Sequence, residues 1–508
     1  MPSAIEPPGG QPWAKLVETH SAVVIFLGDR VVKIKKPVDL GFLDFRSREV
    51  RRRIVEAEVQ LNRRLAPDVY LGVLDIVLEP GRPVDHAVLM RRLPDAARLS
   101  ALIRSGVPVG DHIERIARVL TDFHARAVRP PDAMDIAGPD ALRHLWLATL
   151  GPLEQVTADR TMVDRIHREA IHFITRHSRL LSDRVHEGHI RDGHGDLLAD
   201  DIFCFPDRVE ILDCLEFERR FRIGDTVSDA AFLVMDLERL GAARAARKFA
   251  EDYRRLSGDD FPRVLLQHYI SYRALVRAKV ALVRFEQGDP TAYGTARGLI
   301  SLAHDHARAA RIKVILVGGL PGTGKSTIAE AVSSDLGAAL LSSDRVRKEM
   351  NGIPEGVSAA APYGEGLYTS DMTARVYSEL RARARSAITG GRDVVLDASW
   401  SDPHQRAAVQ DLAERRDVDI VPLECVAPAD VVRTRLAARA QPASSSDAGV
   451  SIYTRMAGGW APWPEAIRID TSGSVEESVA AALAGLEQPQ PVCSSAVSVP
   501  ASEVRSSP

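Results

Sequence analysis

The chain has 508 residues, of which 45% are hydrophobic and 27% are charged, and its formal net charge is −3. This length suggests about three units of ordinary domain size in a globular protein, and the slightly negative charge argues against a protein that coats nucleic acid. No stretch is long and apolar enough to cross a bilayer, and the first residues lack the pattern of a secretory signal. We therefore expect a cytoplasmic protein with reduced cysteines.

The first third of the chain predicts a small β-rich lobe. Residues 1–12 are rich in proline and glycine and are predicted to form a disordered tail, and residues 13–98 contain mostly strand patterns. The segments 23–27 and 31–35 are joined by a Gly-Asp pair, which is a strong hairpin signal. A charged amphipathic helix is expected over 46–65.

A helical lobe is predicted to follow over residues 99–305. Helical periodicity is clear at 112–126, 163–181 and 265–285, and one strand-like interruption spans 201–217. A small β-rich lobe followed by a large helical lobe predicts one unequal two-lobed domain over residues 13–305.

Several side chains in this domain suit phosphoryl transfer. In the run His194-Gly195-Asp196, the aspartate could accept a proton from a substrate hydroxyl. Asp213 ends a later strand and could hold magnesium on a triphosphate. Lys33 and Lys35 share one face of a strand, and either could reach the α- and β-phosphates.

A helix after this strand carries Glu56 and Glu58, and either could pair with the lysine. These pieces resemble the aminoglycoside phosphotransferase and choline kinase branch of the protein-kinase-like fold, over about residues 15–305. The resemblance implies a bilobal, ATP-dependent and magnesium-dependent kinase. It assigns Lys33 and Glu58 to nucleotide binding, Asp196 to accepting the proton and Asp213 to binding the metal.

One position departs from this family. Five residues after the catalytic aspartate, the family usually has an asparagine as a metal ligand, whereas this chain has Asp201, preceded by Asp200. Aspartate can bind magnesium, but the added charge alters the site. The domain is therefore expected to act slowly, to prefer another metal, or only to bind nucleotide.

Residues 311–485 alternate between strand and helix patterns, which predicts a parallel sheet covered on both faces. Asp402 before Pro403 and Ser474 before Glu477 mark two helix starts. Residues 486–508 have too little apolar patterning to fold alone and are predicted to form a disordered tail. The strand candidates are 314–317, 339–342, 394–396, 420–425 and 467–469.

A phosphate-binding loop is predicted between the first of these strands and the next helix. The run 319–326 fits G-x-x-x-x-G-K-[ST], in which backbone amides and a lysine hold nucleotide phosphates and a hydroxyl reaches magnesium. The residues that we expect to bind nucleotide are Gly319, Gly322, Thr323, Gly324, Lys325, Ser326 and Thr327.

Other side chains could complete a second phosphoryl-transfer site. Asp397 ends a buried strand and could hold magnesium together with Ser326. Asp344 could act as a base, although it could also simply cap a helix. Arg435 and Arg439 lie four residues apart on one helix face and precede the soft segment 441–449, so they suit a closing lid or a solvated surface.

Residues 311–485 resemble the P-loop small-molecule and polynucleotide 5′-hydroxyl kinases, in particular the gluconate kinase and chloramphenicol phosphotransferase type. The resemblance rests on the phosphate loop, the segment that contains Asp344 and Arg347, and the arginine-bearing helix. It implies an adenylate-kinase-like core with a five-stranded parallel sheet. The whole chain resembles actinobacterial proteins that join a kinase-like domain to a C-terminal P-loop ATPase.

The predicted fold class is therefore α/β and α+β in two modules: a bilobal protein-kinase-like domain and a P-loop domain with a parallel sheet. The predicted function is phosphoryl transfer from ATP, with Mg²⁺, to small hydroxyl-bearing acceptors. Two alternatives stay open: a pseudokinase joined to a P-loop ATPase in a regulatory protein, and a 5′-hydroxyl polynucleotide kinase. The scattering of basic residues among acidic ones makes a nucleic-acid partner unexpected.

Overall fold

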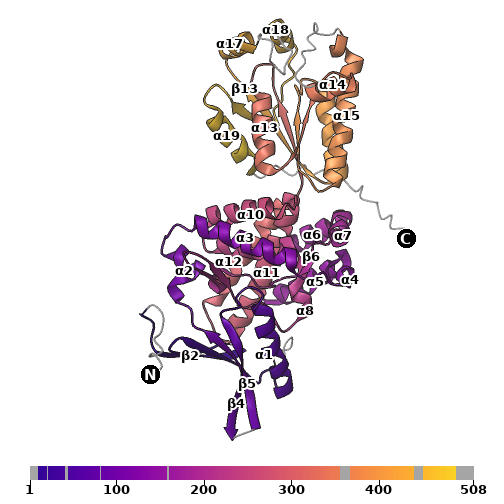
Figure 1. Ribbon diagram of the computed structural model, residues 1–508. Coiled ribbons are helices and arrows are strands. Elements are labelled where there is room, and N and C mark those ends of the chain that lie inside the picture. The colour runs from indigo at the N-terminus through magenta and orange to yellow at the C-terminus, as the bar shows by residue number, and fades with distance from the viewer. Residues whose placement is uncertain are drawn as a thin grey trace, which may run out of the picture. The chain divides into compact units, whose positions relative to one another are not determined.

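The computed structural model shows a chain divided into two compact units, Met1–Arg311 and Ile312–Pro508 (Figure 1). Each unit has its own sheet and its own hydrophobic core. The residues that the structure describes are 10–19, 21–39, 44–79, 82–156, 160–354, 366–439 and 450–487.

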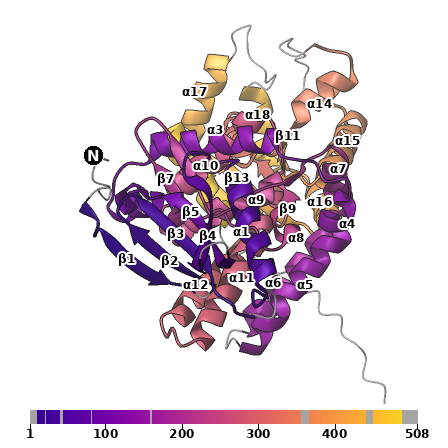
Figure 2. The same ribbon diagram turned by 60° about the horizontal axis from the view of Figure 1, so that its bottom comes forward.

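The first unit begins with an antiparallel sheet in the order β1-β2-β3-β5-β4 (Figure 2). The predicted hairpin is present, and Gly28 turns it with a positive φ of 56°. The helix α1 (Arg48–Asn62) packs against β4 and β5, so that Val55 and Val59 bury their side chains against the sheet. The strands are β1 (Ala14–Glu18), β2 (Ala22–Leu27), β3 (Arg30–Lys35), β4 (Tyr70–Glu79) and β5 (Arg82–Arg91).

A helical lobe completes this unit, as predicted. The sequence pattern over 163–181 predicts one helix, but the structure has α6 and α7 with a break at His177, whose ring packs 4.5 Å from that of Phe173. The helices are α2 (Leu99–Arg104), α3 (Gly110–Arg126), α4 (Ala133–Ala137), α5 (Pro139–Val156), α6 (Arg160–Arg176), α7 (Ser178–His186), α8 (Arg219–Arg222), α9 (Thr226–Arg239), α10 (Ala243–Ser257), α11 (Arg263–Glu286) and α12 (Ala292–Ala309).

Two short antiparallel ladders interrupt the helices and shape the loops between them. The strand β6 (Ile190–Asp192) pairs with β9 (Ile223–Asp225), and β7 (Ile202–Cys204) pairs with β8 (Val209–Ile211). The loops that connect these strands carry the predicted catalytic and metal-binding carboxylates, so the ladders fix where those side chains project.

The second unit is a five-stranded parallel sheet in the order β11-β12-β10-β13-β14. In sequence, its strands are β10 (Lys313–Gly318), β11 (Ala339–Ser342), β12 (Val394–Asp397), β13 (Asp419–Val426) and β14 (Ile467–Asp470). All five strand candidates are thus confirmed, and so is the predicted fold class.

Helices cover both faces of this sheet. The helices α13 (Lys325–Leu336) and α19 (Val475–Glu487) pack together on one face, and α15 (Ser370–Thr389) lies on the other (Figure 1). The helix α16 (Pro403–Arg416) packs against α15. The helices α14 (Ser343–Met350), α17 (Ala429–Arg439) and α18 (Val450–Gly458) lie between these elements in sequence. Among the described residues, no helix combines the length and the apolarity that a membrane span requires.

Candidate functional site

In the first unit, a buried carboxylate joins two lysines of one strand. Glu58 of α1 is fully buried, and its oxygens lie 2.8 Å from Lys33 Nζ and 2.7 Å from Lys35 Nζ. Glu56, the alternative in the sequence, pairs instead with Arg52 on the surface of the helix. Although burial opposes charge at Glu58, the two ammonium groups hold its pKa below the usual range. The helix and the sheet are therefore linked by a charged network.

Asp213 approaches the same network from the helical lobe. Its Oδ1 lies 2.6 Å from Lys33 Nζ, and this ammonium group lowers the pKa of Asp213 to about 2. The backbone of Asp213 has a positive φ of 64°, and its N–H donates to the Tyr70 hydroxyl at 3.1 Å. The next N–H, of Cys214, donates to the side chain of Asn62 at 2.8 Å. The small lobe thus holds the loop that presents Asp213.

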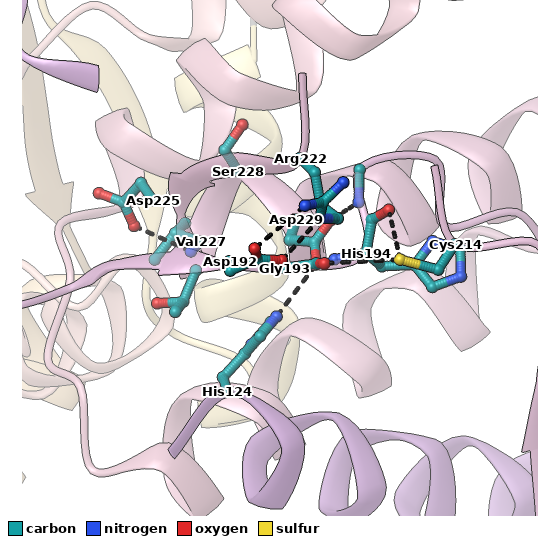
Figure 3. Close-up of polar contacts among 12 residues, drawn as sticks. His124, Asp192, Gly193, His194, Cys214, Arg222, Asp225, Val227, Ser228 and Asp229 are labelled. Carbon is teal, nitrogen blue, oxygen red and sulfur yellow. Dashed lines mark hydrogen bonds and ion pairs between the residues drawn. The ribbon is translucent and has the colours of Figure 1, made fainter. Parts of the chain in front are cut away.

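A buried aspartate braces the loop that carries the predicted base (Figure 3). Asp229 accepts hydrogen bonds from the backbone N–H groups of His194 at 2.7 Å and Gly195 at 2.9 Å, and it contacts His124 Nε2 at 3.1 Å. Despite the burial of Asp229, these polar contacts hold its pKa well below the usual range. His194 is itself fully buried and contacts the carbonyl of Leu212 at 3.0 Å. It therefore connects the loop of Asp196 to the loop of Asp213.

Asp196 is partly exposed and contacts an arginine that the sequence analysis did not single out. Arg277 Nη1, from α11, lies 3.4 Å from both carboxylate oxygens of Asp196. Burial raises the pKa of Asp196 above its usual value, while the charge of Arg277 opposes that rise. An aspartate with a raised pKa is better suited to accept a proton than an ordinary surface aspartate.

Asp201 ends a short 3₁₀ turn and is a neighbour of the other two carboxylates. Burial, together with the charges of Asp213 and Asp196, raises its pKa well above the usual range. Asp200 is engaged elsewhere, because its side chain accepts a hydrogen bond from Ser100 on α2. A divalent cation would relieve the repulsion at Asp201, so the donor set fits Mg²⁺ held by two carboxylates and nucleotide phosphates. Within the described ranges, no group of three or more His, Cys, Asp or Glu side chains is placed to hold a metal by itself.

In the second unit, the predicted phosphate loop joins β10 to the start of α13. Gly319 has a φ of 135°, and a Cβ atom there would lie 2.4 Å from the carbonyl oxygen of Cys425. Gly322 and Gly324 also have positive φ angles, of 82° and 85°. The first turn of α13 contains Lys325, Ser326 and Thr327, whose N–H groups precede the intrahelical hydrogen bonds. This arrangement forms an anion-binding helix start.

Two side chains of the loop contact groups at its rim. Lys325 Nζ donates to the carbonyl of Leu320 at 3.1 Å, and Ser326 Oγ donates to Asp397 at 2.9 Å. Asp397 is the last residue of β12, where burial raises its pKa while Lys325 and Ser326 oppose the rise. The geometry brings together the three side chains that the sequence assigned to phosphate and magnesium. A hydroxyl and a carboxylate are hard oxygen donors, which fit Mg²⁺.

Asp344 and Arg347 form an ion pair in the first turns of α14. Arg347 Nη1 donates to Asp344 at 3.0 Å, and its guanidinium group lies 4.6 Å above the ring of Tyr368. The residue at the N-cap of α14 is Ser342, so Asp344 is not the cap of this helix. The charge of Asp344 also raises the pKa of Asp397.

The helix α17 packs directly on the phosphate loop. A Cβ atom at Gly322 would lie 3.0 Å from both Val432 and Leu436 of this helix. Arg435 Nη2 donates to the carbonyl of Thr471 at 2.5 Å, and the Thr471 hydroxyl in turn donates to the carbonyl of Thr323 at 2.7 Å. Arg435 therefore supports the loop through Thr471. The side chain of Arg439 and the predicted lid over 441–449 lie outside the described residues.

The whole chain has curated relatives of nearly the same length. It is 40% identical over 474 residues to proteins described only as uncharacterized, from Mycobacterium tuberculosis and Mycobacterium bovis, and this alignment covers 92% of the chain and 94% of each relative. The chain belongs to this family. Residues 314–458 also match the family described as AAA domain, which confirms the predicted P-loop module.

Solved structures resemble parts of the chain. A choline/ethanolamine kinase family protein from Mesorhizobium loti is 14% identical, with 60% of this chain and 93% of that chain covered and a TM-score of 0.39. A gluconokinase from Sinorhizobium meliloti is 19% identical, with 34% and 91% covered and a TM-score of 0.25. The APS kinase CysC of Mycobacterium tuberculosis is 20% identical, with 35% and 99% covered and a TM-score of 0.27.

Three features of these sites were missed in the sequence. Arg277 carries no local signal, because α11 contains several other basic residues. Glu216 binds Lys35 at 2.6 Å, but the two residues are 181 positions apart. His124 braces Asp229 from a helix whose apolar pattern predicts only packing. Pairing across such separations cannot be derived from local periodicity.

Proposed function

We propose that the chain is an ATP-dependent phosphotransferase with two nucleotide-binding modules, each acting on a small hydroxyl-bearing acceptor. The observation that carries this proposal is a charge arrangement that occurs in both units. In the first unit Lys33 lies 2.6 Å from Asp213, and in the second Asp397 binds the hydroxyl of Ser326, the residue after Lys325 in the phosphate loop, at 2.9 Å. Phosphoryl transfer requires such paired positive and metal-binding groups around the transferring phosphate.

In the first module, Lys33 would bind the nucleotide phosphates while Glu58 orients the lysine. Asp213 and Asp201 would hold Mg²⁺, which when bound offsets negative charge on the β- and γ-phosphates. Asp196 would receive the proton of the acceptor hydroxyl while the oxygen of that hydroxyl forms a bond to the γ-phosphorus. The bond from that phosphorus to the β–γ bridging oxygen breaks, and ADP leaves.

In the second module, the loop amides and Lys325 would bind the phosphates, and Ser326 and Asp397 would hold Mg²⁺. Asp344 would accept the proton of the acceptor, and Arg347, which forms an ion pair with Asp344, would orient the acceptor. Arg435 would act as a positioning residue for the loop through Thr471.

Transfer of labelled γ-phosphate from ATP tests the proposal and assigns activity to each module. The acceptor panel contains sugars, sugar acids, aminoglycosides, nucleosides and a 5′-hydroxyl oligonucleotide. We expect Lys325→Ala to remove transfer by the second module, Asp196→Asn to remove transfer by the first, and the double variant to label no acceptor. ATP hydrolysis without any labelled acceptor in the native protein would contradict the proposal.

The regulatory alternative is supported by the aspartate at position 201, where the family that this module resembles usually has an asparagine. The charges of Asp213 and Asp196 already act on this carboxyl, so an altered metal site would let the first module bind nucleotide without turnover. Asp201→Asn separates the two functions. An increase in transfer in this variant would show that the native residue restrains catalysis, whereas nucleotide binding without transfer in both proteins would favour the regulatory function.

A further inference from the structure

We propose that the first module acts on an anionic acceptor, a small molecule with a carboxylate or phosphate group close to the hydroxyl that receives the phosphoryl group. This inference rests on the proposed function of that module. The observation behind it is the contact between Arg277 and Asp196, which places a positive charge directly beside the proposed base.

The contact with Asp196 engages one of the three guanidinium nitrogens of Arg277. Only Nη1 of Arg277 reaches Asp196, at 3.4 Å from each oxygen, and within the part of the chain that the structure describes its Nε and Nη2 atoms have no hydrogen-bond partner. Arg222 in the same lobe, by contrast, binds Asp192 through two nitrogens and a backbone carbonyl through the third. Both members of the Arg277–Asp196 pair are partly exposed, at 28% and 33%. Arg277 is therefore partly accessible to solvent and keeps donors without a partner among the described residues.

A second arginine adds to the positive charge at this position. Arg273 lies one turn before Arg277 on α11, and its charge also acts on Asp196. Its guanidinium group is fixed in place, because Nε donates to the carbonyl of Ser228 at 3.1 Å and the group lies 4.8 Å from the ring of Phe232. Arg277 therefore contacts Asp196 directly, and Arg273 adds a second positive charge that acts on it from one turn away along α11.

This arrangement has a chemical consequence for the acceptor. A guanidinium partner stabilises the charged carboxylate of Asp196 and so weakens it as a base. An anionic group on the acceptor would bind Arg277 and so reduce the stabilisation of the Asp196 carboxylate. At the same time the acceptor hydroxyl would form a hydrogen bond to Asp196. A cationic amino sugar would instead bring its ammonium group next to the guanidinium group of Arg277, which costs electrostatic energy.

The geometry also limits the size of the acceptor. One hydrogen bond of about 2.8 Å would join the hydroxyl to Asp196, and another would join the anionic group to Arg277. Because Nη1 of the same guanidinium group lies 3.4 Å from Asp196, an anionic group that binds its other nitrogens must lie close to the hydroxyl. Hydroxy acids, sugar acids and sugar phosphates meet this requirement.

The test measures kcat/KM for phosphoryl transfer in the Lys325→Ala background, so that only the first module contributes. Anionic probes are D-glycerate, D-gluconate and fructose 6-phosphate, which separate carboxylates from phosphates. Neutral probes are glycerol and glucose, and cationic probes are glucosamine and kanamycin. Arg277→Gln removes the charge, and Arg277→Lys restores it without the fork of donors. Arg284→Gln is the matched control, because Arg284 lies on the same helix but pairs with Asp289.

We expect the anionic probes to have the highest kcat/KM, and Arg277→Gln to lower it by about 10- to 150-fold, as for the loss of a charged hydrogen bond. Arg277→Lys should recover part of the loss, and Arg284→Gln should change nothing. A preference for neutral or cationic probes, or an unchanged kcat/KM for anionic probes in Arg277→Gln, would overturn the inference and leave the proposed function standing. Transfer to no probe in any panel would overturn the proposed function, and the inference with it. An unchanged MgATP affinity shows that each variant is folded.

Discussion

Lys35→Met is expected to destabilise the first unit strongly, because Lys35 is almost fully buried between two carboxylates. Its Nζ lies 2.7 Å from Glu58 and 2.6 Å from Glu216. In the variant, Lys33 would be the single ammonium group left for Glu58, Glu216 and Asp213. Removing one partner of a buried ion pair leaves an uncompensated charge and typically costs about 3–5 kcal/mol of unfolding free energy. We expect a loss in that range near pH 8.

The loss should depend on pH in a direction that follows from Glu216. Burial already raises the pKa of this carboxyl above its usual value in the native protein, and the loss of Lys35 would raise it further. In the folded Lys35→Met variant, Glu216 would then hold a proton that the unfolded chain releases. The free energy of unfolding of the variant therefore rises as the pH falls. The difference in the free energy of unfolding between Lys35→Met and the native protein should become smaller as the pH is lowered from 8 to 5.

Hydrogen exchange measured by mass spectrometry on peptides of β3 and α1 resolves this effect within the first unit of the intact chain. Lys36→Met is the matched control, since Lys36 is the next residue and pairs with the exposed Glu18. Its effect should be too small to resolve. The reasoning would be refuted if the two substitutions lowered stability equally. It would also be refuted if the loss of stability in Lys35→Met grew as the pH fell.

Three further predictions concern the two sites. Gly319→Ala should abolish MgATP binding by the second module, because its Cβ would lie 2.4 Å from a carbonyl oxygen, whereas Gly459→Ala, with no atom closer than 4.0 Å, should preserve it in a calorimetric titration. Ser326→Ala should raise the Mg²⁺ concentration for half-maximal turnover of the second module by at least about 10-fold, and an unchanged requirement would argue against Ser326 as a ligand. First-module turnover should fall as the pH is lowered, because only the ionised form of Asp196 accepts a proton. The fall should begin at a higher pH than for an ordinary aspartate, because burial raises the pKa of Asp196. Arg277→Gln should move this limb of the pH profile upward, and a profile that does not move would contradict the role given to the pair.

The sequence predicts the second unit well, because its signals are local. The phosphate loop is a contiguous motif, and the alternation of apolar strands and amphipathic helices is visible within short windows. Helix starts are equally local: Asp402 accepts from the N–H of His404, and Ser474 and Glu477 bond reciprocally as a capping box. Such features depend on neighbouring residues and not on the tertiary fold.

The charged contacts of the first unit depend on the tertiary fold and are harder to predict. The sequence allows Glu56 or Glu58 to pair with the strand lysine, and only packing against the sheet decides for Glu58, which becomes fully buried. Arg277 reaches Asp196 across 81 positions, and Arg435 reaches Thr471 across 36. No pattern within one helix reveals which of its arginines meets a distant carboxylate.

The claim that each module binds a nucleotide is tested most directly by calorimetric titration of MgATP into the native protein, Lys325→Ala and Asp213→Asn. We predict two saturable binding events in the native protein, of which Lys325→Ala removes one and Asp213→Asn weakens or removes the other. The absence of saturable binding in the native protein, or two unchanged events in both variants, would contradict the account.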